Sequence, residues 1–307
     1  MNKFSFIFPG QGSQVVGMGE DFFNNSVIAK EAFEEASERL SIDMASLLFK
    51  ENELLHNTEY SQPAILLVSS IAHSLFEHEL AIKPVFTMGH SLGEFSSLVA
   101  AKALSLEDAV ELVHLRGKFM KEACAGKEAG MMVLLGLKDE QVEEMTANAR
   151  DDGKQIWAAN YNCNGQLVVA GIKSDLQSLE SSFKEAGAKR ALLLNMSVAS
   201  HCPILEPASQ QLKPYLEKFL KEKFICNIVS NVTAKEYNTK DEAIQLIMAQ
   251  LTKPVLYKQS ITAHEDKVEL FIEFGAKVLK GLNKKTTTKE TMSITDMASL
   301  EQVINTL

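Results

Sequence analysis

A short apolar run that leads into a glycine-flanked serine is the feature that most constrains the fold. Val85-Phe86-Thr87-Met88 is followed at once by Gly89-His90-Ser91-Leu92-Gly93, and an amphipathic pattern then continues from Phe95 to Ala103. The run predicts a buried strand, the glycines permit a sharp turn, and the later pattern predicts a helix. Such a turn lifts the serine side chain out of the sheet. We therefore expect Ser91 to be a nucleophile, although the five-residue pattern alone also occurs in plain strand-helix turns.

A second strand followed by a glycine turn lies at the start of the chain. Phe4-Ser5-Phe6-Ile7-Phe8 is almost wholly apolar and ends at Pro9-Gly10-Gln11-Gly12. If this strand neighbours the one before Ser91, Gln11 can present its amide or its backbone N–H to an oxyanion at the serine. A glutamine that only stabilises the turn is the alternative.

A serine nucleophile needs a base within hydrogen-bond reach, normally a histidine. His90 adjoins Ser91, but consecutive residues in a sharp turn point apart. His201 lies in the small-residue segment Ser197–Pro203, where the chain returns to its larger part, and we expect it to be the base; a purely structural histidine stays open from this pattern alone. The neighbouring Cys202 is a weaker candidate nucleophile. Five other histidines are expected in polar helices or loops: His56, His73, His78, His114 and His264.

Arg116 interrupts the apolar face of a predicted helix. Ser105-Leu106-Glu107-Asp108 is typical of a helix start. The stripe that follows contains Ala109, Leu112, Val113, Arg116 and Met120. A buried guanidinium costs several kcal/mol unless it is paired, and its planar fork fits a carboxylate. Arg116 is therefore a candidate for binding a substrate carboxylate, or else an arginine whose charged end reaches the surface.

The order of predicted elements indicates an α/β fold with an insertion. The segment from residue 130 to 195 predicts the order strand, helix, strand, strand, helix, strand, which is that of a ferredoxin-like unit. Its expected elements are strand 131–135, helix 139–150, strand 155–160, strand 166–170, helix 174–187 and strand 190–195. Strands 225–230 and 268–274 then indicate a return to the first sheet, and 284–291 is expected to be a solvated loop. We place the large domain at 1–126 and 198–307 and the inserted domain at 127–197.

Composition excludes several classes of function. A formal charge of −9 disfavours a nucleic-acid partner. Four scattered cysteines, without zinc-type spacing, indicate reduced thiols, no metal site and a cytoplasmic location. The apolar run at 4–8 is too short for a signal peptide. The apolar stretch 63–80 carries too many polar residues for a membrane span.

Several separate motifs in this order resemble one family, the malonyl-CoA:acyl carrier protein transacylases. The resemblance rests on the segments already described at residues 8–14, 89–94, 116 and 200–201, and it extends to five more: Asn160-Tyr161-Asn162, Gly165–Gly171, Gln250-Leu251 before Pro254-Val255, Glu273-Phe274-Gly275 and Lys277-Val278-Leu279. It therefore covers nearly the whole chain.

The resemblance implies an α/β-hydrolase-like large domain, an inserted ferredoxin-like small domain and an active site between them. It implies that Ser91 attacks a malonyl thioester, that His201 moves the proton and that Arg116 pairs with the malonyl carboxylate. It also implies that the backbone N–H groups of Gln11 and Leu92 hold the oxyanion, and that the backbone carbonyl of Gln250 orients His201. The implied partners are malonyl-CoA and an acyl carrier protein, with no cofactor, for fatty acid biosynthesis.

Two residues bear on the extender unit. Ala199 stands where many members have proline, which leaves branched extenders such as methylmalonyl open, whereas Leu92 after the serine favours malonyl. The rival functions are a serine thioesterase or esterase, which releases acid to water, and a non-catalytic module that binds carrier proteins. We expect a monomer.

Overall fold

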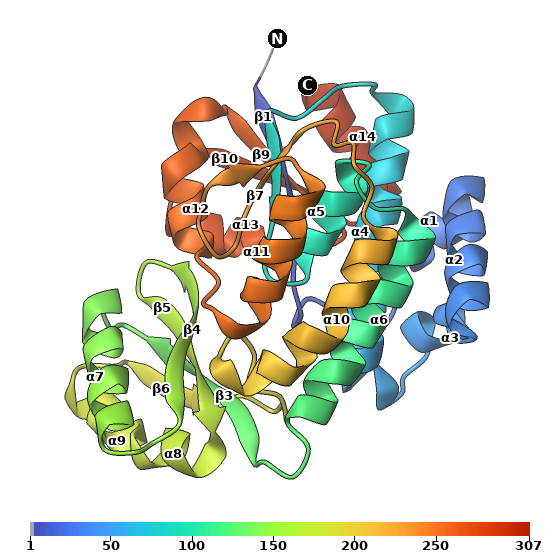
Figure 1. Cartoon of the computed structure of the whole chain (residues 1–307). Coiled ribbons are helices and arrows are strands. Elements are labelled where there is room, and N and C mark those ends of the chain that lie inside the picture. The colour runs from blue at the N-terminus through green and yellow to red at the C-terminus, as the bar shows by residue number, and fades with distance from the viewer. Residues whose placement is uncertain (1–2) are drawn as a thin grey trace.

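The computed structural model describes residues 3–307, which form a large and a small part around two separate sheets (Figure 1). The large sheet has six strands in the order β10-β9-β1-β2-β7-β8. Its strands are β1 (Phe4–Phe8), β2 (Phe86–Gly89), β7 (Asn227–Val229), β8 (Glu236–Tyr237), β9 (Leu270–Phe274) and β10 (Glu290–Ile294). All neighbours run parallel except β7 and β8. Mixed α/β architecture is confirmed.

The register of this sheet brings three loops together. Phe8 at the end of β1 pairs with Gly89 at the end of β2, and Met88 pairs with Val229 at the end of β7. Loops that follow the carboxyl ends of neighbouring parallel strands meet at one edge of a sheet, which is where such folds place their sites. The segments after β1, β2 and β7 are therefore adjacent in space.

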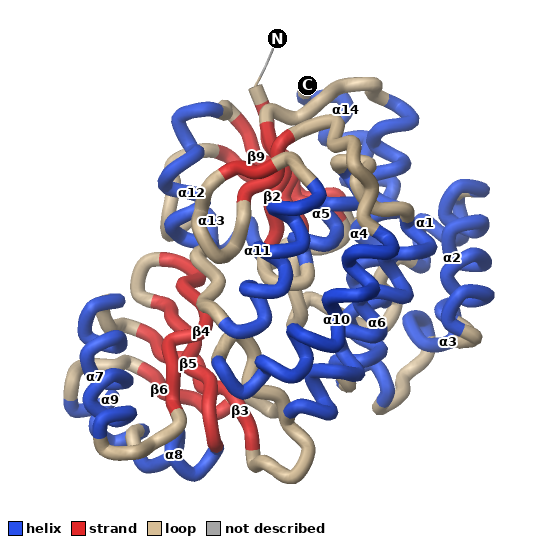
Figure 2. Tube along the Cα trace, viewed as in Figure 1, coloured by secondary structure: helices blue, strands red, loops and turns tan. Residues whose placement is uncertain are grey.

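Helices cover the large sheet, and the buried faces of α4, α5 and α6 supply much of its core (Figure 2). No helix among the described residues combines the length and apolar character that a membrane crossing needs. The helices of this part are α1 (Glu20–Asn25), α2 (Val27–Leu40), α3 (Met44–Phe49), α4 (Thr58–Glu79), α5 (Gly93–Ala100), α6 (Leu106–Ala123), α10 (Glu206–Phe219), α11 (Lys240–Thr252), α12 (Tyr257–His264), α13 (Leu279–Asn283) and α14 (Met297–Thr306), with short 3₁₀ helices η1 (Leu54–His56), η2 (Pro203–Leu205) and η3 (Glu265–Lys267).

The small part is a four-stranded antiparallel sheet in the order β4-β5-β3-β6 with helices on one face. Its elements are β3 (Ala129–Leu135), α7 (Asp139–Asp151), β4 (Ile156–Cys163), β5 (Gln166–Ile172), α8 (Lys173–Ser178), α9 (Glu180–Glu185) and β6 (Arg190–Leu193). Side chains alternate along β3 and β5: Met132 and Val169 pack toward the helices, whereas Met131 and Val168 belong to the core of the large part. The small sheet therefore forms one wall of the space between the parts.

Two expected elements differ from the structure. The single helix expected at 174–187 is two short helices, α8 and α9, because the Leu179 N–H bonds to the Leu176 carbonyl in a tighter turn. The polar segment 284–291 is not wholly a loop, since Glu290 and Thr291 begin β10, an edge strand parallel to β9. The domain boundaries at 126/127 and 197/198 stay predictions, and residues 1 and 2 lie outside the described part.

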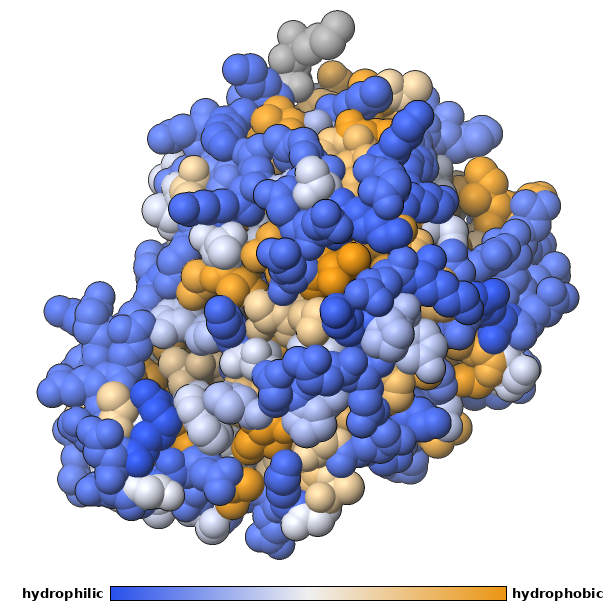
Figure 3. All heavy atoms as spheres, viewed as in Figure 1, coloured by the Kyte–Doolittle hydropathy of each residue, from blue (hydrophilic) through white to orange (hydrophobic). Residues whose placement is uncertain are grey.

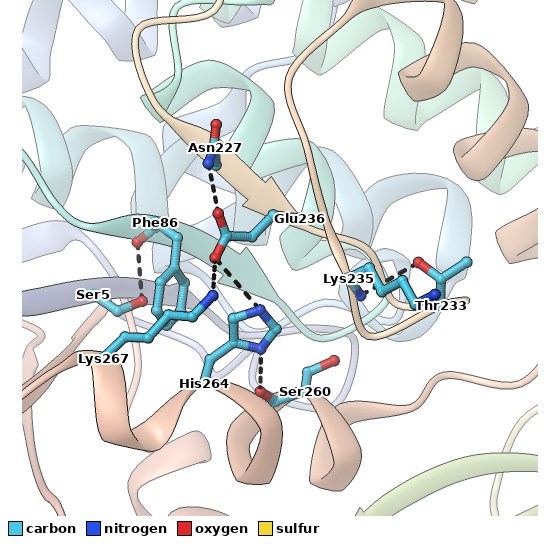
Figure 4. Close-up of polar contacts among 9 residues, drawn as sticks. All are labelled: Ser5, Phe86, Asn227, Thr233, Lys235, Glu236, Ser260, His264 and Lys267. Carbon is cyan, nitrogen blue, oxygen red and sulfur yellow. Dashed lines mark hydrogen bonds and ion pairs between the residues drawn. The ribbon is translucent and has the colours of Figure 1, made fainter.

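Two histidines expected in polar settings are buried instead. His73 lies edge-on to Phe6, Phe8 and Phe274 in the core, and burial lowers its pKa to about 4. His264 packs against Phe86 with ring centroids 5.1 Å apart and faces Glu236 on β8 (Figure 4). The expectation for His73 was wrong because a single polar residue gives no sign of which face of its helix is buried, whereas the buried His264 keeps polar partners in Glu236 and the Ser260 carbonyl.

Polar residues cover most of one face of the molecule. The face in Figure 3 is mostly hydrophilic, with apolar residues in small patches. Among residues 3–307 no group of three or more His, Cys, Asp or Glu side chains could hold a metal ion.

Candidate active site

The turn between β2 and α5 holds Ser91 in a conformation that its neighbours make possible. Ser91 has φ 51°, in the left-handed region that non-glycine residues seldom adopt. A Cβ on Gly89 would lie 2.0 Å from the Gly93 carbonyl carbon, and one on Gly93 would lie 2.0 Å from the Phe8 carbonyl oxygen. Both glycines are thus required by close backbone contacts, and the serine between them faces the space between the two parts.

His201 contacts Ser91 directly. The Ser91 Oγ lies 2.8 Å from His201 Nε2, and His201 Nδ1 lies 2.7 Å from the backbone carbonyl oxygen of Gln250. A carbonyl only accepts, so Nδ1 carries the proton and Nε2 is free to accept one from the serine. Burial, followed by the charge of Arg116, lowers the pKa of His201 to about 3. The imidazole is therefore neutral near pH 7, as a general base must be.

The other thiol and imidazole near this pair are oriented elsewhere. His90 Nε2 lies 2.7 Å from the Oδ1 of Asn162 on β4, across the gap between the two parts. The Cys202 thiol donates to the Ala199 carbonyl, and burial raises its pKa to about 12. A thiol that stays protonated is a poor nucleophile, so Ser91 is the only one of these groups paired with a base.

Arg116 reaches the serine from α6. Its side chain is buried, with a relative exposure of 2%, so the expectation of a surface-reaching arginine is wrong. Its Nη1 donates to Gln62 Oε1 at 2.7 Å, and its Nη2 donates to Gln250 Oε1 at 3.0 Å and to Ser91 Oγ at 3.2 Å. The guanidinium carbon lies 5.3 Å from the centroid of the Phe95 ring. All three acceptors are neutral, so the guanidinium charge is available to an anion that enters beside Ser91.

Gln11 follows β1, and Leu92 adjoins Ser91 in the turn after β2. Gln11 lines the same cavity as Ser91, and its side-chain oxygen accepts a hydrogen bond from Thr58 Oγ1 at 2.9 Å. Leu92 is buried and immediately precedes α5. Neither backbone N–H has a hydrogen-bond acceptor within residues 3–307. Two free N–H groups near a nucleophile are what an oxyanion needs.

A cavity of about 520 Å³ joins these residues. Its large-part wall includes Gln11, Ser91, Arg116 and His201, and β3, β4 and β5 supply the opposite wall. Polar side chains on the small-part side include Asn160, Asn162, Gln166 and Asn195. This volume and this mixture of apolar and polar lining are typical of a small-molecule site.

Four polar residues beside the site have no role that the sequence predicts, although Glu94 lies within the motif at residues 89–94. Gln62 on α4, Glu94 on α5, Asn231 after β7 and Tyr237 on β8 all hydrogen-bond within or next to the site. Asn231 could have been identified from the sequence, because it follows a strand that was expected in the same sheet as the strands before Gln11 and Ser91. The other three sit within helices or strands whose pattern alone marks them as ordinary.

Comparison with known proteins agrees with this geometry. The sequence profile of the acyl transferase domain matches residues 5–304. A malonyl CoA-acyl carrier protein transacylase of Bacillus subtilis is 39% identical, covering 100% of this chain and 98% of that protein. The crystal structure of malonyl-CoA:acyl carrier protein transacylase from Helicobacter pylori is 46% identical with a TM-score of 0.97, covering 100% and 98% of the two chains.

A third relative was solved with a partner. It is a malonyl-transacylase in complex with its type II polyketide synthase acyl-carrier protein, 33% identical with a TM-score of 0.95, covering 99% of this chain and 100% of that one. Identity above 30% over whole chains, together with the matched profile, establishes common descent. The chain is an acyltransferase and belongs to the acyl transferase family, in the branch of the malonyl-CoA:acyl carrier protein transacylases.

Proposed function

We propose that this enzyme moves a malonyl group from malonyl-CoA to the phosphopantetheine thiol of an acyl carrier protein through an ester on Ser91, and so supplies the extender unit for fatty acid biosynthesis. The observation that carries the proposal is the contact of the Ser91 hydroxyl with a neutral histidine on one side and a buried arginine on the other. A hydrolase needs the first contact, but only an enzyme for a carboxylated acyl group needs the second.

In the first half-reaction His201 Nε2 takes the hydroxyl proton as Ser91 Oγ attacks the thioester carbon. The backbone N–H groups of Gln11 and Leu92 stabilise the oxyanion of the tetrahedral intermediate. When that intermediate collapses, the carbon–sulfur bond breaks and His201 returns the proton to the CoA thiolate. The Gln250 carbonyl stabilises the imidazolium that forms in between, since it accepts from Nδ1 at 2.7 Å.

The second half-reaction runs the same steps in reverse. The carrier thiol gives its proton to His201 and attacks the ester carbon, and the Ser91 oxygen leaves with the proton that His201 then holds. Arg116 fixes the carboxylate of the malonyl group throughout, which keeps the ester carbon beside the entering thiol. Malonyl is the extender we expect.

The carrier protein is expected to dock on a basic surface at the mouth of the cleft. Carrier proteins of this kind are acidic, so an enzyme with a formal charge of −9 needs a local excess of cations. The Asn164 side chain in the β4–β5 turn donates to the Lys285 carbonyl at 2.8 Å, and this contact between the two parts supports a surface that spans both of them. The proposed surface comprises Lys184, Lys189, Arg190, Lys277, Lys280, Lys284 and Lys285.

We infer a finer description of the fold as well. The order β4-β5-β3-β6 and the succession of strands and helices support a ferredoxin-like small domain. The parallel sheet with a serine turn after β2 supports an α/β-hydrolase-like large domain. The enzyme is proposed to work as a monomer in the cytoplasm without a cofactor, and its four free cysteines suit a reducing compartment.

Intact-mass spectrometry tests the proposal. The protein is mixed with malonyl-CoA and then with an acyl carrier protein in its phosphopantetheine form, next to Ser91→Ala. A malonyl adduct that requires Ser91 and passes to the carrier is expected. Free malonate without a lasting adduct would make the chain a thioesterase, and neither adduct nor malonate would leave only a carrier-binding module.

A further inference from the structure

Glu94 is a fully buried carboxylate three residues after Ser91, in the first turn of α5. It accepts three hydrogen bonds: from Gln250 Nε2 at 2.7 Å, from the Asn231 backbone N–H at 3.2 Å and from the Tyr237 hydroxyl at 3.0 Å. It contacts neither the cavity nor the Ser91 side chain. Burying a charge costs free energy, so a carboxylate at this position calls for an explanation.

Two of its three partners clamp the backbone of Ser91. The Ser91 N–H donates to Asn231 Oδ1 at 2.6 Å, and the Ser91 carbonyl accepts from Gln250 Nε2 at 3.0 Å. Ser91 is held at φ 51°, a conformation that persists only when its surroundings impose it. Glu94 therefore holds the side chain of Gln250 and the backbone of Asn231, the two residues that hold the nucleophile.

The Gln250 side chain also faces Arg116, and its direction depends on Glu94. A carboxylate only accepts hydrogen bonds, so Glu94 requires the NH₂ end of the Gln250 amide to point toward it. The oxygen end then accepts from Arg116 Nη2 at 3.0 Å. The Gln250 backbone carbonyl meanwhile accepts from His201 Nδ1 at 2.7 Å. One glutamine thus contacts the nucleophile, the base and the arginine.

The intervening amide also separates two buried charges. A direct ion pair between Glu94 and Arg116 would occupy the N–H groups that a substrate carboxylate needs. With Gln250 between them, Glu94 offsets the guanidinium charge without competing for its N–H groups. Burial raises the pKa of Glu94 to about 7, opposed by its hydrogen bonds and by Arg116.

We propose that Glu94 is a positioning residue for acyl transfer: acting through Gln250 and Asn231, it sets the Ser91 turn and directs the Gln250 amide oxygen at Arg116. The inference rests on the proposed function, since it assigns a role within that reaction. A second buried carboxylate, Glu273, has a purely structural role and serves as a comparison. Glu273 accepts from the backbone N–H groups of Val278, Leu279 and Lys280 at the start of α13 and lies outside the cavity.

The experiment measures single-turnover acylation by malonyl-CoA, quenched on the millisecond scale and read by intact mass. Glu94→Gln keeps the size but removes the charge. The hydrogen bonds from Gln250 Nε2 and the Asn231 N–H, which share one carboxylate oxygen, are therefore expected to weaken, even where the Tyr237 hydroxyl turns to accept from the new NH₂ group. The acylation rate constant should fall about 10–100-fold, because a displacement of about 1 Å costs up to about 10²-fold. The dissociation constant of malonyl-CoA should stay within about threefold, since Glu94 does not contact substrate.

The control is Glu273→Gln. It makes the same change in a buried carboxylate outside the cavity. It should acylate within about threefold of the wild-type rate. The final acylated fraction counts folded enzyme, so a rate loss is not confused with unfolding. Equal slowing of Glu94→Gln and Glu273→Gln would overturn the proposal.

Coupling to Gln250 is tested with Gln250→Met, which removes the amide but keeps the backbone carbonyl. If Glu94 acts through Gln250, the double variant should be little slower than either single variant. A rate loss in the double variant that equals the product of the two single losses would overturn the idea that Glu94 acts through Gln250. If Glu94→Gln does not fold, Gln250→Met alone is expected to show the same loss of rate, and a wild-type rate there would refute the proposal.

The pH dependence supplies a readout that a structural role would not change. The ionisable groups facing Glu94 are Arg116 from α6 and Tyr237 from β8, with His201 and Glu242 beyond them. Arg116 stays charged with a pKa of about 10, Tyr237 stays neutral because burial raises its pKa, and His201 stays neutral with a pKa of about 3. Wild-type acylation should therefore slow as pH falls through about 7, and Glu94→Gln should show no such step.

Different results would refute the proposed function and the role of Glu94. An adduct that still forms in Ser91→Ala would sink the proposed function whatever Glu94 does. An adduct that requires Ser91, together with a Glu94→Gln rate within threefold of wild type or an unchanged pH step, would refute only the role of Glu94.

Discussion

Replacing Arg116 by methionine keeps most of the side-chain volume but removes the guanidinium. Arg116 Nε has no hydrogen-bond partner within residues 3–307, and Nη2 donates one N–H to Gln250 Oε1 and the other to Ser91 Oγ at 3.2 Å, a contact that an entering carboxylate can replace. Two N–H groups are thus available to the malonyl carboxylate. Hydrogen bonds to charged groups contribute about 1.5–3 kcal/mol each. The lower end of that range applies, because the carboxylate is also well hydrated in water.

The expected loss is about 3–4 kcal/mol, or about 100–1,000-fold in kcat/KM for malonyl-CoA. Acetyl-CoA has no carboxylate, and loss of the guanidinium charge makes His201 a stronger base, so its kcat/KM should not fall and the malonyl-to-acetyl ratio should fall by nearly the full factor or more. The assay is acylation by each thioester with Arg116→Lys alongside, which retains the charge without the fork and should lose only about tenfold. A ratio within threefold of wild type would refute the role of Arg116.

Three further predictions concern the base, the turn and the buried histidines. His201→Ala should slow acylation at least 100-fold while the melting temperature changes little, measured by quenched flow and calorimetry. Gly93→Ala should destabilise the fold by several kcal/mol in urea unfolding, because its Cβ would lie 2.0 Å from the Phe8 carbonyl oxygen, whereas Gly281→Ala, with nothing within 4 Å, should be neutral. His73 and His201 have folded pKa values of about 4 and about 3, below their usual 6.5. Their contribution to stability is complete above pH 6.5 and is lost as pH falls, by about 2 kcal/mol each at pH 5; His73→Leu should flatten that slope, and an unchanged slope would contradict it.

Local patterns predicted those parts of the fold that local forces determine. The strand at Phe4–Phe8 has the bounds expected, and the helix after Ser105 begins where the capping pattern placed it. The edge strand β10 was missed because its stability comes from pairing with β9, which no local pattern reveals. His73 was misplaced for the same reason, since its burial depends on Phe274 from a distant strand.

The same distinction applies to the residues of the site, because local patterns identify some of them and contacts between distant segments determine the others. Ser91 stands out because its turn needs glycines at fixed positions, and Arg116 because a charge on an apolar face is anomalous. Glu94, Asn231 and Gln62 act through hydrogen bonds between residues 137, 140 and 54 positions apart in the chain. Such contacts exist only after the sheet has brought the ends of β1, β2 and β7 together.

Arg116 affects the base as well as the substrate, and the two effects act together. Its charge is the second cause, after burial, of the low pKa of His201. A low pKa keeps the imidazole neutral but also makes it a weaker base. A malonyl carboxylate bound to Arg116 offsets that charge, so the pKa of His201 should rise when a carboxylated acyl group occupies the site. An acetyl group brings no negative charge next to the guanidinium, so the pKa of His201 stays low and the base stays weak. The discrimination between the two acyl groups should therefore appear in the rate of acylation as well as in binding, because the residue that recognises the substrate also adjusts the strength of the base.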